Sequence, residues 1–317
     1  MKLVEQSAKL LKQEFGNTRK EIVNNAYKHA AICAGICYSS KKTYDDIDEA
    51  KYFVNNVLIK NNHFSPLAHA TCYLDISYND KESVSDCDKI YAISKDQYAK
   101  AYINVVFYKY KIEQISARGS YLHDHLFIET NLRFIIEHNL LDEYNKYCVS
   151  EDYVMNKINP LLDDDQYLIS PRKTVIVETS RVIATEFNRH AANMAICGMS
   201  TRYCNLSNTD KFGDIKFIKN ISDEISYEHN LLIDDAYTFC EQTYCKLIEM
   251  GLKPEMARSV LPLNLYTQLA YTANMKEWEH IFDLRINGTT GKPHPDAKDL
   301  AMKIREAISN NLTTVIE

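Results

Sequence analysis

The stretch GLKPEMARSVLPLNLYTQLAYTANMKEWEHIFDLR, residues 251–285, carries the clearest structural pattern in the chain. Its first part, 254–260, is typical of a short helix that ends before Pro262, a residue without the N–H that a continuing helix needs. Its second part predicts a helix over 272–286, because its apolar residues recur at helical spacing. The residues that share this spacing are Trp278, Ile281, Phe282 and Arg285.

The rest of the chain predicts a helix-rich α/β (α+β) fold. Strands are expected at 70–77 and 174–178. Ser180 is placed to cap the helix that follows the second strand, and 191–205 is expected to be a loop or a helix-to-loop passage. Further helices are expected over 2–15, 18–35, 45–61, 222–250 and 294–312.

Residues 77–171 are predicted to be a mostly helical insertion within a single domain that spans 1–317. The insertion is roughly 95 residues long, and its strongest helical patterns lie at 94–115 and 120–147. Polar turns bound it, so we expect it to pack on the domain rather than to form an independent one.

Composition excludes several classes of protein. The 317 residues are 45% hydrophobic and 25% charged, with Gly 8 and Pro 7, which argues against a disordered, collagen-like or turn-dense all-β chain. The net charge of −6 gives no overall attraction to nucleic acid. The nine cysteines contain no C-x-x-C pair, so no zinc site of that spacing is expected. Without a signal peptide or a long apolar run, we expect a cytoplasmic protein with reduced cysteines.

Two polar segments are candidate binding loops. His63-Phe64-Ser65-Pro66-Leu67-Ala68-His69 places two histidines around a proline, and the alternative is a loop with a capping serine and a packed histidine. Arg189-His190 and the later Ser200-Thr201-Arg202-Tyr203 offer cations and hydroxyls that suit a phosphate or pyrophosphate, and the alternative is a surface loop with ion pairs.

The segment 251–285 adds further polar candidates. Arg258 lies at a helix end, where it either binds an anion or caps helix carbonyls. Three other polar residues lie away from the apolar stripe of the second helix: Asn274, Lys276 and His280.

Together and in this order, these segments resemble the flavin-dependent thymidylate synthases. The run 251–285 is similar to that family nearly residue for residue, and HFSPLAH (63–69) resembles its H-x-[ST]-P-x-x-H loop. AGICYSS (34–40) resembles its early A-x-x-[SC]-[YF] stretch, and SRVIATEFNRH with the later MSTRY resembles its R-H-R-x7-S signature. The similar parts cover 22–76 and 174–310. The resemblance implies an α/β core that assembles as a homotetramer, with FAD and nucleotide sites shared between subunits.

The resemblance also implies a reaction and a set of site residues, without a metal ion. A one-carbon unit passes from methylenetetrahydrofolate to C5 of dUMP with a hydride from reduced FAD, and NADPH reduces the flavin again. The positions that the resemblance assigns to FAD are Cys37, His63, Ser65, Arg189, His190, Asn274, Lys276 and His280. Those that it assigns to the nucleotide are Glu186, Ser200, Thr201, Arg202, Arg258 and Arg285, with Arg285 over the uracil and, with Ser200, at the reaction itself.

The chain departs from the family pattern at the site. Ala191 stands where the signature has its third Arg, the spacing from Arg189 to Ser200 is one residue longer, and Glu186 replaces a Gln. The candidate cations that could compensate for the lost arginine are Arg118, Arg133 and Arg172. An ionised Glu accepts hydrogen bonds without donating them, so Glu186 suits the amino group of cytosine better than a carbonyl.

Three hypotheses follow from the resemblance and its departures. The first is methylation of dUMP to dTMP. The second is a flavin-dependent hydroxymethylase of dUMP or dCMP, as in a viral or phage pathway of modified DNA. The third is an inactive nucleotide-binding paralogue, which the retained arginines at 202, 258 and 285 disfavour because a scaffold has no need of a nucleotide clamp.

Overall fold

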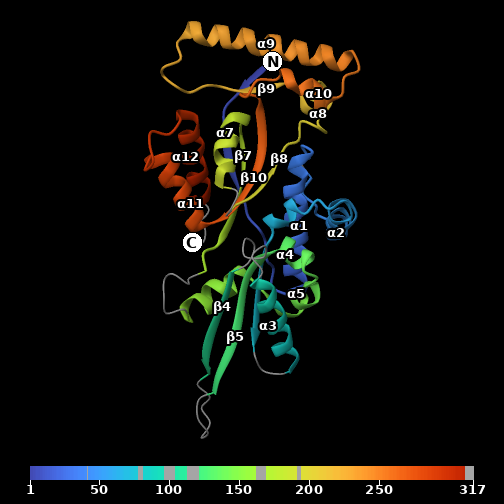
Figure 1. The fold of residues 1–317 in the computed structure, drawn as a ribbon, viewed down its shortest axis with the longest axis vertical. Coiled ribbons are helices and arrows are strands. Elements are labelled where there is room, and N and C mark those ends of the chain that lie inside the picture. Colours follow the sequence, from blue (N-terminus) through green and yellow to red (C-terminus); the bar gives the residue numbers. More distant parts are fainter. Residues whose placement is uncertain are drawn as a thin grey trace. The chain divides into compact units, whose positions relative to one another are not determined.

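The computed structural model describes residues 1–40, 42–77, 81–95, 104–112, 121–161, 169–190 and 194–310. The chain forms two compact units (Figure 1). The first unit comprises Met1–Lys12, Cys33–Lys42 and Lys173–Glu317, and the second comprises Gln13–Ile32 and Thr43–Arg172. Helix α1 (Arg19–Cys37) begins in the second unit and ends in the first.

The first unit is built on a four-stranded sheet with the order β2-β7-β10-β8. The outer strands pair antiparallel with their neighbours: Ser7 lies opposite Glu178, and Leu269 lies opposite Gly198. A separate two-stranded sheet pairs β1 with β9 in parallel. The bounds are β1 (Lys2–Val4), β2 (Ser7–Leu11), β7 (Arg172–Ser180), β8 (Ala195–Gly198), β9 (Lys216–Ile218) and β10 (Tyr266–Asn274).

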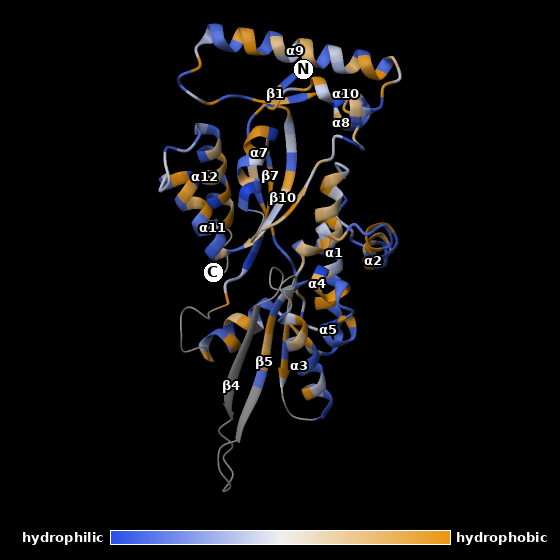
Figure 2. Ribbon diagram, viewed as in Figure 1, coloured by the Kyte–Doolittle hydropathy of each residue, from blue (hydrophilic) through white to orange (hydrophobic). Residues whose placement is uncertain are grey.

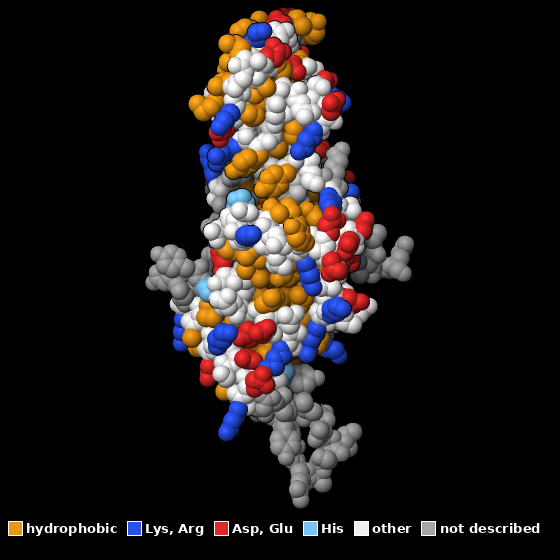
Figure 3. Space-filling model, turned by 90° about the vertical axis from the view of Figure 1, so that its right-hand side faces the viewer, with side chains coloured by type: hydrophobic (Ala, Val, Ile, Leu, Met, Phe, Trp, Pro, Cys, Tyr) orange, Lys and Arg blue, Asp and Glu red, His pale blue; other side chains and the backbone are white. Residues whose placement is uncertain are grey.

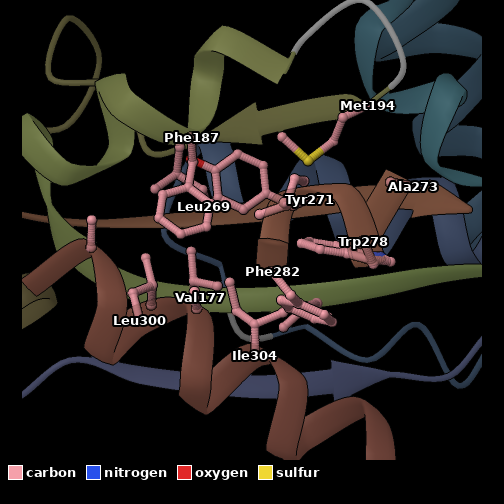
Figure 4. Packing of buried hydrophobic residues seen from close by; sticks show 14 of the residues in the cluster. Val177, Phe187, Met194, Leu269, Tyr271, Ala273, Trp278, Phe282, Leu300 and Ile304 are labelled. Atoms are coloured by element: carbon pink, nitrogen blue, oxygen red, sulfur yellow. The ribbon is translucent and has the colours of Figure 1, made fainter. Parts of the chain in front are cut away.

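Successive side chains along β7 and β10 point to opposite faces of this sheet. One face packs against helices that follow the strands, α7 (Arg181–Phe187), α11 (Met275–Phe282) and α12 (Pro295–Ser309) (Figure 4). The buried residues of this core include Val175, Val177, Phe187, Leu269, Tyr271, Trp278, Phe282, Leu300 and Ile304.

The opposite face of the sheet is covered by the last turn of α1. Cys33 and Ile36 from the helix pack with Cys197 and Ala270 from the strands. The hydroxyls of Thr174 and Thr272 lie 2.7 Å apart on this face and join the two central strands by a buried hydrogen bond. The sheet therefore has an apolar interior on both sides.

Side-chain caps fix where the helices of the first unit begin. The Ser180 hydroxyl accepts a hydrogen bond from the Ile183 N–H, which confirms the predicted cap of α7. Asn274 caps α11 in the same way, through the Glu277 N–H at 2.8 Å. The long helix α9 (Tyr227–Glu249) begins after Ser226, which forms a capping box with His229. The shorter elements are α8 (Thr209–Phe212), α10 (Pro254–Ala257), the 3₁₀ turns Asn188–His190 and Arg258–Val260, and the π-turn Asp283–Asn287.

The second unit is built on an antiparallel sheet with the order β4-β5-β3-β6. The strands are β3 (Thr71–Ser77), β4 (Asn104–Ile112), β5 (Tyr121–Asn131) and β6 (Cys148–Val149). Tyr73 and Phe127 pack with Val154 and Ile158 in its core. Its helices besides α1 are α2 (Ile47–Phe53), α3 (Lys81–Ser94), α4 (Leu132–Glu137), α5 (Leu141–Tyr147) and α6 (Glu151–Tyr153), with shorter turns at Val54–Leu58, Ile59–Asn61, Ser65–His69, Val154–Ile158 and Asn159–Leu161.

Two histidines are buried in the second unit beside an arginine. Burial lowers the pKa of His29 to about 3, and the charge of Arg172 lowers it further in the same direction. Burial also holds the pKa of His69 well below its usual value. Arg172 donates to the Ala68 carbonyl at 3.0 Å and to the Thr71 hydroxyl at 3.3 Å. The folded unit therefore keeps both imidazoles neutral around a fixed guanidinium.

The expected mixture of helices and sheet is confirmed, and several predicted elements are confirmed with it. The helix expected over 18–35 is α1, the strands expected at 70–77 and 174–178 are β3 and β7, and the turn 254–260 is helical before Pro262. Among the described residues, no helix is both long and apolar enough to span a membrane. The proposed boundaries of an insertion at 77–171 stay a prediction.

Other predicted elements are wrong. The expected helix 2–15 is replaced by β1 and β2, because pairing with β9 and β7 satisfies its backbone. In place of helices at 94–115 and 120–147 lie β4 and β5, followed by α4 and α5, while 96–103 and 113–120 are outside the described residues. The passage 191–205 contains β8, and the helix expected over 272–286 begins only at Met275 because 266–274 is strand β10. Helix α9 likewise begins at Tyr227 rather than near 222.

The core of the first unit predicts a large stability effect at α12. Ile304 is fully buried, whereas Met302 on the same helix is 46% exposed. Ile304→Ala should lower the free energy of unfolding by about 2–5 kcal/mol, because it removes apolar contacts and leaves a cavity. Met302→Ala, the matched control, should change it by about 0.5 kcal/mol or less. Urea unfolding of the two variants measures this, and equal midpoints would contradict the packing.

The buried His29 predicts acid sensitivity of the second unit. Its folded pKa is about 3 against about 6.5 when unfolded, so protons bind the unfolded chain first as pH falls below about 6.5. Stability should therefore be complete above that pH and fall by up to about 1.4 kcal/mol per pH unit below it. Hydrogen exchange in β3 and α1 at about pH 7 and about pH 5 measures the slope. His29→Gln should reduce the slope, with the remainder coming from His69, whose pKa is also lowered by burial. An identical slope in variant and wild type would refute the assignment.

Candidate functional site

An ion pair joins two predicted nucleotide-binding residues in the first unit. Arg285 donates from one guanidinium nitrogen to the Glu186 carboxylate at 3.0 Å and from the other to the Glu186 carbonyl at 3.0 Å. Both side chains are mostly buried, with 16% and 21% of their surface exposed. Arg285 Nε is buried and has no hydrogen-bond partner among the described residues. The arginine is therefore held in one orientation with a donor left over.

His190 lies next to this pair in a small polar cluster. Its Nδ1 lies 3.3 Å from a Glu277 carboxylate oxygen, and its ring meets the His280 ring edge-on with centroids 5.9 Å apart. Burial lowers the pKa of His190, Glu277 raises it, and Arg285 and His280 lower it. Its Nε2 is buried without a partner in the described part of the chain. A mostly neutral imidazole with one open ring nitrogen results.

The other flavin candidates of this region differ in role. Asn274 uses its side-chain oxygen to cap α11, so that oxygen is already engaged. Lys276, Arg189 and His280 are exposed, which leaves their polar ends at the surface of the unit. The sequence did not single out Glu277, although it lies within the same short run. An acidic residue in the first turn of α11 was the available signal.

A second cluster gathers the predicted phosphate-binding residues. Arg258 donates to the Thr201 hydroxyl at 3.0 Å, rather than capping helix carbonyls. Arg202 is exposed and pairs with Glu255 at 3.3 Å, and its guanidinium lies over the Tyr203 ring. The Ser200 hydroxyl accepts from the Arg202 N–H at 3.2 Å. The loop 200–203 and the turn that begins at Arg258 thus bring two guanidinium groups and two hydroxyls together. Glu255, which pairs with Arg202, was not among the predicted residues.

Cys37 connects to this loop through its backbone. Its carbonyl accepts a hydrogen bond from the Ser200 N–H at 3.0 Å. Its sulfur lies 3.0 Å from the sulfur of Cys197. The end of α1 is therefore joined to the start of the loop 200–203.

The remaining predicted residues lie elsewhere. His63 and Ser65 are exposed and belong to the second unit, where His69 is the packed histidine. Ala191 and Arg118 are outside the described residues. Of the candidate replacement cations, Arg133 pairs with Glu137, and Arg172 is half-buried in the second unit, where it donates to the Ala68 carbonyl.

A pocket of about 750 Å³, including its open mouth, lies on the first unit and was not predicted. Glu178 of β7 and Asp214 are the acids in its lining, and Glu178 accepts hydrogen bonds from the hydroxyls of Tyr266 at 2.7 Å and Ser7 at 2.9 Å. Lys211 and Lys216 also line it. Because the carboxylate is already well satisfied, its main effect is to join β2, β7 and β10.

No metal centre is apparent in the described ranges. No group of three or more His, Cys, Asp or Glu side chains gathers there in a way that could hold an ion. All nine cysteines are free.

Comparison with known proteins finds a family model and several relatives that are similar to part of this chain. Residues 171–312, from β7 to the end of α12, match the family model "Thymidylate synthase complementing protein". The flavin-dependent thymidylate synthase of Synechocystis is 26% identical over 150 residues, which cover 45% of this chain and 68% of that protein. The probable enzyme of Paramecium bursaria Chlorella virus 1 is 26% identical over 140 residues, covering 41% and 64%. That of Thermotoga neapolitana is 34% identical over 78 residues, covering 24% and 32%.

Among solved structures, a UMP/dUMP methylase, PolB from Streptomyces cacaoi, bound with 5-Br dUMP, aligns with a TM-score of 0.37 and 19% identity. That alignment covers 44% of this chain and 66% of PolB. The family match includes both polar clusters of the first unit. Residues 171–312 are therefore similar to the flavin-dependent thymidylate synthases, at modest identity.

Proposed function

We propose that this chain is a flavin-dependent enzyme that transfers a one-carbon unit to C5 of a pyrimidine nucleotide, with dUMP as the first candidate substrate. The observation that carries the proposal is that the family segment 171–312 contains both the Arg285–Glu186 cluster and the Thr201–Arg258 cluster, in one compact unit. Methylenetetrahydrofolate as carbon donor and NADPH as reductant belong to the same proposal.

The residues present fit an anionic flavin nucleotide. Buried His190 Nε2 is a polar atom that lacks a partner among the described residues, and exposed Arg189 and Lys276 add positive charge. Buried polar atoms are normally hydrogen-bonded, so such an orphan favours a bound partner. We propose His190, Arg189 and Lys276, with Cys37, Asn274 and His280, as the part of an FAD site that the first unit supplies. His63 and Ser65, which lie in the second unit, are also proposed to bind FAD.

Bound FAD would supply and accept the hydride, and the chain's own residues bind and orient the substrate. Arg258 and Arg202, with the Ser200 and Thr201 hydroxyls, would bind the nucleotide phosphate through charge-assisted hydrogen bonds. Arg285 would stabilise charge that develops on a ring carbonyl, and its double contact with Glu186 keeps it oriented beforehand.

Glu186 gives the second candidate function specific support. Its carboxylate already compensates Arg285, and it offers only acceptors to a substrate. A cytosine amino group matches an acceptor, whereas the uracil carbonyl needs a donor. We therefore retain a flavin-dependent hydroxymethylase of dUMP or dCMP as the alternative, with dCMP favoured by Glu186, and an inactive nucleotide-binding paralogue as the third.

We also propose that the chain assembles as a homotetramer and that it is located in the cytoplasm. Within helix α9 only Tyr237 and Tyr244 are buried, and several large apolar side chains are exposed. Figure 2 shows hydrophobic residues (orange) spread along the α9 ribbon among hydrophilic ones. Orange side chains stand out at the top of Figure 3, where Figure 1 shows α9. An apolar surface of this kind favours cover by another chain. Its large exposed residues are Tyr227, Leu231, Leu232, Phe239 and Met250.

The mass of the product tests the function. Incubated without oxygen with FAD, NADPH, methylenetetrahydrofolate and dUMP, the purified chain should convert dUMP to a methylated nucleotide. Arg285→Ala should lower kcat at least about 100-fold, because it removes a donor at the reacting ring, and should leave flavin bound. Arg305→Ala, an exposed arginine on α12, is the control and should change nothing. Unchanged turnover in Arg285→Ala would mean that the site is elsewhere, and no product together with no bound flavin would favour the paralogue.

The choice of base is tested at Glu186. Glu186→Gln exchanges a carboxylate for an amide that can donate to a carbonyl. The ratio of kcat/KM for dCMP to that for dUMP should fall about tenfold or more, because a hydrogen bond to a charged group is worth about 1.5–3 kcal/mol. Glu279→Gln, exposed on α11, is the matched control. A ratio that does not move would exclude Glu186 as the residue that reads the base.

A further inference from the structure

Four cysteines lie near one another in the first unit. Cys33 and Cys37 lie at the end of α1, Cys197 lies in β8, and the Cys204 sulfur lies 3.7 Å from the Cys37 carbonyl oxygen. The Sγ atoms of Cys37 and Cys197 are 3.0 Å apart, about 1 Å more than a covalent S–S bond of about 2.0 Å. These two thiols come from residues 160 positions apart, so the fold rather than local sequence brings them together.

Backbone contacts hold both residues in place. The Cys37 carbonyl accepts from the Ser200 N–H at 3.0 Å, and Cys197 pairs with Ala270 of β10. The Cys197 thiol also lies 3.3 Å from the Cys33 carbonyl, to which it can donate. The two sulfurs are therefore held next to each other, about 1 Å short of bonding distance.

The two thiols differ in exposure. Cys197 is 4% exposed and packs with Ile36 and Ala270 in the apolar cluster of the sheet. Cys37 is only half-buried, so a small solute reaches it more easily. An accessible thiol in contact with a buried one is the arrangement of an attacking and a resolving cysteine.

The two thiols also differ in acidity. A hydrogen bond from the Cys197 thiol lowers the pKa of Cys37. The pKa of Cys197 is raised well above its usual value by the same contact and by burial. The thiolate is the reactive form of cysteine, so Cys37 is the first sulfur to react.

We propose that Cys37 and Cys197 are a redox modification site, at which a hydroperoxide converts the two thiols into a reversible disulfide. The Cys37 thiolate attacks the peroxide O–O bond, takes one oxygen as a sulfenic acid and releases hydroxide, or alkoxide from an alkyl hydroperoxide. The Cys197 sulfur then attacks the Cys37 sulfur, the S–O bond breaks, and the hydroxyl leaves as water with the thiol proton. With hydrogen peroxide, the overall reaction converts two thiols and one peroxide into one disulfide and two water molecules. A small dithiol reduces the disulfide back to the two thiols.

This proposal does not depend on the nature of the reaction that the protein catalyses. It does have a structural target, because Cys37 is bonded through its carbonyl to Ser200. A bond between the sulfurs would link the end of α1 covalently to β8, close to the hydrogen bond between Cys37 and Ser200. Oxidation is therefore expected to restrict the movement of the loop 200–202.

The test uses the full-length reduced protein and hydrogen peroxide. After a stoichiometric dose, free thiols should fall by two from the nine of the reduced chain, and non-reducing peptide mapping should recover one linked peptide pair containing Cys37 and Cys197. Dithiothreitol should restore both thiols. In Cys197→Ser, a sulfenic acid at Cys37 should be trapped by dimedone and no disulfide should form.

Cys240→Ser, a half-buried cysteine of α9 outside this cluster, is the control and should still form the link. Several results would overturn the proposal. They are unchanged thiols at both positions, oxidation of Cys37 that stops at sulfinic acid while Cys197 stays free, or a link from Cys37 to Cys33 or Cys204. Because the decisive measurement uses the wild-type chain, it does not depend on whether any variant folds.

Discussion

The alternation of side chains along the two central strands, β7 and β10, is the constraint on which the first unit depends. Val175 and Val177 face one core, while Ile176 faces the other, and the buried Thr174–Thr272 hydrogen bond fixes the strands to each other. A shift of one residue in either strand would exchange the two faces. It would send apolar side chains to the wrong core and separate the sulfurs of Cys37 and Cys197.

The position of the Arg285–Glu186 cluster depends on how β7 and β10 end. β7 ends at Ser180 and β10 ends at Asn274, and each of these residues caps the helix that follows. Helix α7 then carries Glu186, and the turn after α11 carries Arg285, so that two residues 99 positions apart meet. The caps fix the directions of both helices, and the ion pair depends on them.

Sequence reasoning could predict what is local. The Ser180 cap, the strand at 174–178 and the turn before Pro262 depend on neighbouring residues, and all three are confirmed. The helix expected over 2–15 fails because Lys9, Leu10 and Leu11 fit a helical pattern equally well, and only pairing with β7 selects the strand. The start of α11 was missed for a related reason, since Asn274 suits both a helix and its cap. The family motif indicated Arg285 and Glu186 as site residues, but their contact, like those of His190 with Glu277 and of Arg202 with Glu255, needed the fold.

The pairing of β2 with β7 has a consequence for how the protein is made. Ser7 and Glu178, which face each other and share a hydrogen bond, are separated by 171 positions. A ribosome adds about 5–20 residues per second, so β2 waits on the order of ten seconds or more for its partner. During that time Gln13–Ile32 and Thr43–Arg172 emerge, and together they can fold as the second compact unit. The N-terminal strand thus joins its sheet late, and a chaperone that shields a short apolar strand in the meantime would act on Ala8, Leu10 and Leu11.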